Sequence, residues 1–72
     1  MTPPSEKTKQ EVLEHRVEFM AVFIKAMRDE WKISPDLINY FQEADRRFII
    51  KFCYMLDMEH EPYLTMYDGK IR

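Results

Sequence analysis

Residues 12–31, VLEHRVEFMAVFIKAMRDEW, carry the strongest pattern in this 72-residue chain. Apolar side chains recur there at spacings of three and four residues, at Leu13, Val17, Met20, Ile24, Met27 and Trp31. Such spacings place side chains on one side of an α-helix, because one turn takes about 3.6 residues. A second apolar row follows one step around the same helix, at Val12, Phe19, Phe23 and Ala26. The stretch therefore predicts a long helix whose apolar side is broader than a coiled-coil seam.

The start of this helix has two candidate caps. Thr8 and Glu11 have the spacing of a capping box, and Ser5 is the alternative cap. The pattern continues to Trp31 or Lys32. Residues 1–5 contain a proline pair and predict a flexible N-terminal lead, with residues 6–72 as a single helical domain.

The clearest boundary in the sequence is Ser34-Pro35. Proline disfavours helical geometry in the residue before it but suits the first turn of a new helix, with Ser34 as the N-cap. We therefore predict a second helix over residues 35–44. Asp45 can cap a third helix from Arg46 to Met58, and one bent helix over both ranges is the alternative.

The C-terminal segment has mixed signals. Pro62 predicts that the preceding helix ends by Glu61, and residues 63–67 suit either a strand or a short helix. Asp68-Gly69 is typical of a turn. The predicted fold class is thus all-α, a small three-helix domain with a long first helix and a short C-terminal helix or strand.

Composition excludes several classes of protein. The net charge is −2 with interspersed signs, which differs from a basic nucleic-acid surface or a polybasic membrane anchor. The longest apolar run, residues 19–24, is far shorter than the roughly 20 residues that span a bilayer. One cysteine, Cys53, cannot form an intramolecular disulfide and fits a reducing cytosol, so we expect a cytoplasmic protein.

No motif in the chain predicts a reaction. The only grouping with metal-ligand chemistry is Asp57, Glu59, His60 and Glu61, and its spacing is more typical of a solvated helix end. Cys53 lies in an apolar stripe, where a free cysteine packs as a small hydrophobe. We therefore predict no catalytic, cofactor-binding or metal-binding residue, and no enzyme.

A nucleic-acid-binding transcriptional regulator is the alternative function. Arg46, Arg47 and Lys51 could contact phosphates, and helices over 35–44 and 46–58 would imitate a helix-turn-helix. The second of these helices is mostly apolar, whereas a recognition helix presents polar side chains to the groove. Overall acidity also opposes binding to nucleic acid.

We do not expect a three-helix monomer of 72 residues to cover all of the apolar surface, and large exposed apolar patches mark partner surfaces. We therefore predict a protein-interaction module that binds a protein partner or a second copy as a homodimer. Tyrosine suits such a surface because its ring is buried while its hydroxyl stays wet. The predicted contact residues are Val12, Phe19, Phe23, Tyr54, Tyr63 and Tyr67.

The chain resembles a family of small uncharacterised bacterial proteins found beside ADP-ribosyltransferase-like toxin genes. The shared pattern covers residues 19–71 and consists of Phe19, Phe23, Ile24, Ile33-Ser34, Phe41, Phe48-Ile49, Tyr54, Leu56, Tyr63-Leu64 and Ile71. The family often has a Leu-His-Thr step, whereas Leu56 is followed here by Asp57-Met58. The resemblance implies a non-enzymatic, antitoxin-like or inhibitory protein that acts through protein contacts and has no catalytic residue.

Overall fold

The computed structural model describes residues 5–72, which form three helices and no strand. These are α1 (Glu6–Asp29), α2 (Pro35–Met55) and α3 (Glu61–Ile71). The predicted fold class, a small all-α domain with a long first helix and a short C-terminal helix, is confirmed. Of the predicted N-terminal lead, residues 1–4 lie outside the described part of the chain.

Ser5, the alternative cap, is the residue that begins α1. Its Oγ accepts a hydrogen bond from the Thr8 backbone N–H at 3.2 Å, which satisfies one of the free donors of the first turn. The helix ends at Asp29, before the predicted end at Trp31. The prediction that Trp31 belongs to the buried stripe is therefore wrong: its side chain is exposed in the loop after α1.

The prediction of separate helices over 35–44 and 46–58 is wrong, because α2 runs unbroken from Pro35 to Met55. Pro35 opens the helix as expected, and the continuous helix was the alternative. Asp45 caps nothing; its carboxylate instead accepts a hydrogen bond from the Tyr67 hydroxyl of α3. A contact distant in sequence therefore satisfies the polar side chain that resembled a cap.

The chain leaves α2 after Met55, turns, and enters α3 at Glu61, just before Pro62. The Met58 N–H donates to the Cys53 carbonyl at 2.9 Å, and Asp57 adopts a positive φ of 57°, so the chain turns out of the helix there. Pro62 lies in the first turn of α3, where its missing N–H costs nothing. The predicted turn at Asp68-Gly69 is also wrong, because both residues belong to α3.

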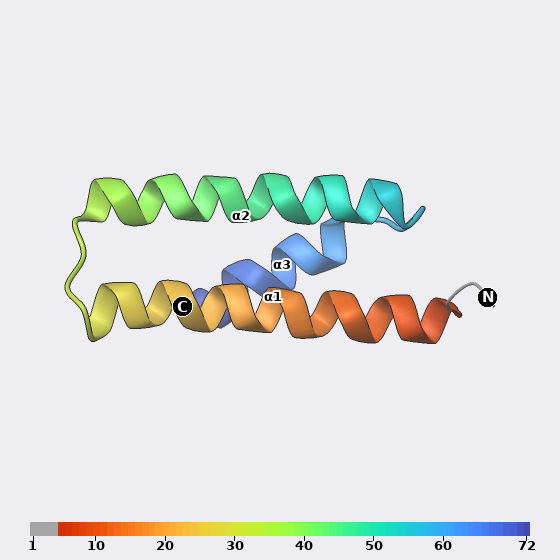
Figure 1. Ribbon diagram of the computed structural model, residues 1–72, viewed down its shortest axis with the longest axis horizontal. Helices are drawn as coiled ribbons and strands as arrows, with labels where there is room; N and C mark the ends of the chain where they lie inside the picture. Colours follow the sequence, from red (N-terminus) through yellow and green to blue (C-terminus); the bar gives the residue numbers. More distant parts are fainter. Residues whose placement is uncertain (1–4) are drawn as a thin grey trace.

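The three helices form two layers. α1 and α2 are an antiparallel pair in the front layer, and α3 crosses behind them (Figure 1). Arg28 Nη1 of α1 donates to the Ile71 carbonyl at 3.0 Å, which ties down the C-terminal end of α3. The molecule measures 43 × 21 × 17 Å. One face of the α1–α2 pair is thus packed by α3, and the opposite face has no third helix over it.

The core lies between α3 and the front layer. It is built from five residues of α1, three of α2 and four of α3, namely Leu13, Val17, Ala21, Ile24, Met27, Ile38, Ile49, Cys53, Tyr63, Leu64, Tyr67 and Ile71. None of the five phenylalanines of the chain belongs to this buried core. Phenylalanine is among the residues most often buried, so its place elsewhere calls for an explanation.

Candidate partner-binding face

Four of the five phenylalanines line the groove between α1 and α2, and we call this surface the phenylalanine face. Its members are Phe19 and Phe23 of α1 and Phe41 and Phe48 of α2. Phe52 stacks on Phe48 and packs, partly buried, against the core. Two adjoining depressions of this groove are lined by residues of α1 and α2 alone. The phenylalanine face is therefore the side of the helix pair that α3 does not cover.

The rings on this face pack against one another. Phe48 and Phe52 stack with ring centres 5.4 Å apart, and Phe19 and Phe23 are 6.5 Å apart. The edge of Trp31 meets Phe23 at 5.4 Å, so the aromatic surface continues past the end of α1. These contacts hold the rings in place although Phe19 is 67% exposed and Phe23 45% exposed. The rings of this face thus contact one another in the unbound chain.

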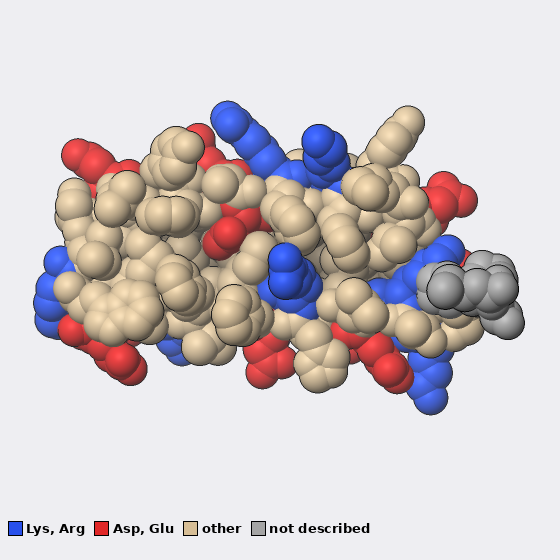
Figure 2. Space-filling model, viewed as in Figure 1, with Lys and Arg blue, Asp and Glu red and all other residues tan. Residues whose placement is uncertain are grey.

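Figure 2 shows this face, because its view places α1 and α2 in front of α3. Most of the surface is formed by uncharged residues, and the charged side chains stand mainly around its outline. A centre with few charges and a charged rim is typical of protein–protein interfaces.

Two charged residues lie inside the groove. Asp45 lines both depressions, and Arg16 lines one of them with its guanidinium 5.3 Å from the centre of the Phe48 ring. Asp45 is half-buried, and burial raises the pKa of its carboxyl group, although the hydrogen bond from Tyr67 opposes this. A partly desolvated carboxylate amid aromatic rings favours a cation from a partner.

The Asp45–Tyr67 hydrogen bond joins the groove to the core. The Tyr67 hydroxyl donates to Asp45 Oδ2 at 2.6 Å, and the Tyr67 ring is 1% exposed. Burial, followed by the hydrogen bond to Asp45, raises the pKa of Tyr67, so the hydroxyl keeps its proton. Asp45 therefore accepts a hydrogen bond from behind while its remaining surface lines the open groove.

We expect Asp45→Asn to change how stability depends on pH. Because the folded-state pKa of Asp45 is raised, its contribution is complete below the unfolded pKa of about 3.9 and is lost as pH rises through the folded value. Asparagine does not ionise, and its oxygen can still accept from Tyr67. The variant should therefore gain stability relative to the wild type as pH rises, measured by urea unfolding at several pH values. A stability difference that stays constant with pH would contradict this.

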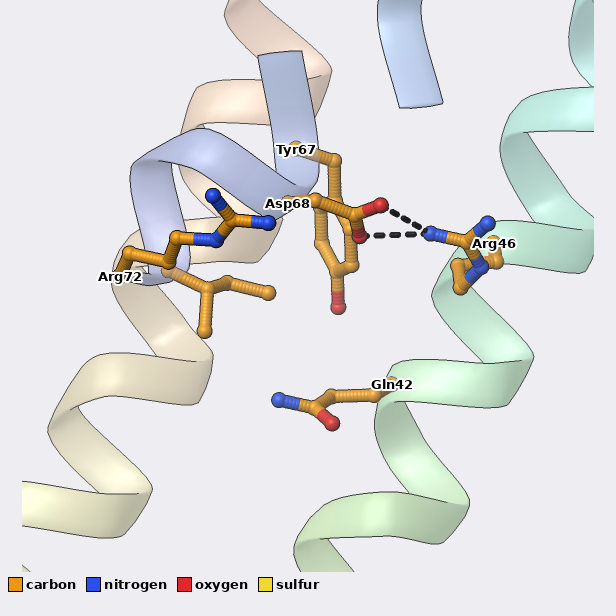
Figure 3. Close-up of a pocket in the computed structure, with 6 residues that line it drawn as sticks. Gln42, Arg46, Tyr67, Asp68 and Arg72 are labelled. Carbon is orange, nitrogen blue, oxygen red and sulfur yellow. Dashed lines mark hydrogen bonds and ion pairs between the residues drawn. The ribbon is translucent and has the colours of Figure 1, made fainter. Parts of the chain in front are cut away.

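On the opposite side, α2 meets α3 through a second polar contact. Arg46 Nη1 lies 2.6 Å from both carboxylate oxygens of Asp68 (Figure 3). Gln42 and Arg72 line the same small pocket, and the Tyr67 ring stands at its back. The pocket has a mixed polar and apolar lining and is bounded by an ion pair whose partners satisfy each other, so its chemistry is that of a helix–helix contact.

The structure separates the predicted contact residues into two groups. Phe19 and Phe23 lie on the phenylalanine face, and Val12 is exposed on α1. Tyr54 is 85% exposed but lies near the loop after α2. Tyr63 and Tyr67 are buried in the core, so the prediction that they contact a partner is wrong for this structure. They pack inward because α3 is a helix whose apolar side closes the core.

Sequence analysis missed the α2 half of the face. Phe41, Phe48 and Phe52 had been divided between two predicted helices, so their common side was not apparent. The spacing 41, 45, 48 and 52 places all four residues on one side once α2 is continuous. Had one continuous helix been predicted over this range, the common side of these phenylalanines would have been apparent.

The residues of the alternative hypotheses are not brought together. Arg46 pairs with Asp68, whereas Arg47 points toward Glu43 with a 3.9 Å separation. The turn of the predicted helix-turn-helix does not exist, because α2 passes through it. Within residues 5–72, no group of three or more His, Cys, Asp or Glu side chains could hold a metal ion. Cys53 is buried in the core, as predicted, and burial raises the pKa of its thiol.

Compared with known protein families, with curated proteins and with solved structures, the chain matches none of them. None of the helices in residues 5–72 has the length and apolar character that crossing a membrane requires. The arguments for function therefore rest on the phenylalanine face.

Proposed function

We propose that this protein is a non-enzymatic protein-interaction module that binds a protein partner through the phenylalanine face. One observation carries the proposal: four of the five phenylalanines line the face that α3 leaves open, and none of the five is among the fully buried core residues. Removing their rings from water supplies the affinity, since aromatic side chains bury large apolar areas. The resemblance to toxin-adjacent bacterial proteins supports an antitoxin-like or inhibitory role, in which the module occludes its partner.

A phenylalanine on this face differs from a core phenylalanine in how much it contributes to the stability of the fold. A core phenylalanine stabilises the folded state, whereas an exposed one gains little from folding. Phe19 and Phe23 remain about half exposed or more, so most of the free energy their rings can supply is still available to a partner. Their mutual packing also lowers the entropy lost on binding.

Aspartate substitutions on α1 test the proposal. We expect Phe19→Asp and Phe23→Asp to abolish binding of the partner, because a charge placed within an apolar interface must be desolvated. The test is a pull-down from the cells that make the protein, with tagged wild type and variants, and with far-UV circular dichroism as the check on helicity.

Val22→Asp is the matched control. Val22 neighbours Phe23, is exposed on α1 and does not line the groove. We expect it to retain every protein that the wild type retains. A folded Phe19→Asp or Phe23→Asp variant that retains the same proteins would overturn the proposed function.

A further inference from the structure

We propose that the occupant of the phenylalanine face is a second copy of this chain. Two α1–α2 pairs would then pack face to face as a four-helix bundle, with one α3 helix on each outer side. This inference rests on the proposed function and names its partner. Three observations on the molecule support this inference: the exposed area, the two opposite charges in the groove and their positions on different helices.

The first observation is the exposed area. A folded monomer of 8.9 kDa is expected to expose about 4,800 Å² of surface. This protein exposes 5587 Å². The excess is about 800 Å², and a standard stable interface takes about 800 Å² from each partner, so the elongated molecule has enough additional surface for one such interface. The radius of gyration of 13.3 Å likewise exceeds the about 11 Å of a compact chain of this length.

The second observation is that the groove carries both halves of an ion pair. Arg16 and Asp45 are the two charged residues among the six that line one depression. Arg16 has no carboxylate partner within its own chain among the ion pairs of residues 5–72. The half-buried Asp45 has a hydrogen-bond donor in Tyr67 but no cation. Among residues 5–72 the face thus carries one cation, which lies over the Phe48 ring, and one carboxylate, neither with an ion-pair partner, so the charges of two copies can complement each other.

The third observation is where these charges lie along the helices. Asp45 is the central residue of the 21-residue α2, and Arg16 is within two residues of the middle of α1. In a two-fold interface each contact occurs twice. A two-fold axis that lies in the interface and runs parallel to the helices sets α1 of each copy against α2 of the other, and it therefore brings Arg16 of each copy toward Asp45 of the other.

Dimerisation also suits the size of the chain. Domains this small bury a modest core, and association is a common remedy. Covering the phenylalanine face would place the rings of Phe19, Phe23, Phe41 and Phe48 in a second apolar layer, between the two front layers of the dimer.

Sedimentation equilibrium of the purified full-length chain, from low micromolar to millimolar concentration, tests the proposal. We expect a wild-type mass of twice 8.9 kDa and a Phe23→Asp mass of 8.9 kDa, while Val22→Asp stays dimeric. We expect Arg16→Glu to raise the dimer dissociation constant about tenfold or more, since it sets two carboxylates against each other twice. Arg47→Glu makes the same charge change outside the groove and should leave the constant unaltered.

Each outcome of this experiment either supports the proposed dimer or overturns it. A wild type that is monomeric at every concentration overturns the dimer, and so does a dimer that Arg16→Glu and Arg47→Glu weaken equally. A dimer that survives Phe23→Asp places its interface elsewhere and overturns the inference as well. The proposed function fails separately: it fails when folded Phe19→Asp and Phe23→Asp chains retain the same partners as the wild type, whatever the mass of the wild type.

Discussion

Tyr67→Ala is expected to remove most of the stability of this protein. A domain of this length has an unfolding free energy of about 4–11 kcal/mol, and truncating a buried aromatic ring costs about 3–5 kcal/mol. Tyr67 is the largest fully buried side chain, and it lies where α1, α2 and α3 meet. The same change removes the hydrogen-bond donor of the half-buried Asp45. Urea unfolding followed by far-UV circular dichroism measures the loss.

Tyr67→Phe separates the two contributions. This variant keeps the ring and removes only the hydroxyl that donates to Asp45 at 2.6 Å. Hydrogen bonds to charged groups contribute about 1.5–3 kcal/mol, so a loss in that range is expected. If Tyr67→Phe unfolded at the same urea concentration as the wild type, the hydrogen bond would contribute nothing and the ring alone would join the layers.

Ile49→Ala is the substitution with the next largest expected effect. Ile49 has no exposed surface and is one of only three buried residues of α2. Removing a buried isoleucine to the β-carbon costs about 2–5 kcal/mol, because both apolar burial and packing are lost. The expected result is a lower urea midpoint with an unchanged dependence on urea concentration.

Ile50 provides a matched control one residue away. It is 41% exposed, so Ile50→Ala should change the unfolding free energy by no more than about 0.5 kcal/mol. Comparing Ile49→Ala with Ile50→Ala isolates the effect of burial on the unfolding free energy, because the residue type, the helix and the helix propensity are the same at both positions. Equal losses for the two variants would mean that α2 turns a different side toward the core.

The periodicity of α1 was sufficient to predict its buried side. Leu13, Val17, Ile24 and Met27 are buried as expected, because their spacing determines a helical face whatever the partner helix is. The end of the helix was less predictable. Trp31 continues the spacing, but the chain leaves the helix after Asp29, and apolar character alone does not distinguish a core residue from one in a loop.

Asp45 shows why α2 was divided in error. A short acidic residue between apolar stretches is typical of an N-cap, and the sequence contains no sign of the group that satisfies it. That group is the Tyr67 hydroxyl, 22 residues further along the chain. Tertiary contacts of this kind outweigh local sequence preferences. A second such contact, from Arg46 to Asp68, stabilises Asp68-Gly69 in a helix.

The candidate site was predicted only by half. Phe19 and Phe23 follow from the second apolar row of α1, whereas their α2 counterparts depended on an unbroken helix. Tyr63 and Tyr67 were expected on an exposed surface, but they are buried, because residue type alone does not distinguish a core tyrosine from a surface tyrosine. Both outcomes depend on where α3 packs, and the packing of α3 is set by contacts with both other helices.

The absence of phenylalanine from the buried core has a consequence for how this chain can change over generations. Aliphatic side chains and two tyrosines hold the three helices together, so substitutions at Phe19 or Phe23 leave that core intact. Selection for a folded chain and selection for a particular partner therefore act on largely different positions. A descendant could acquire a new partner by altering the rings of its open face while inheriting the same scaffold.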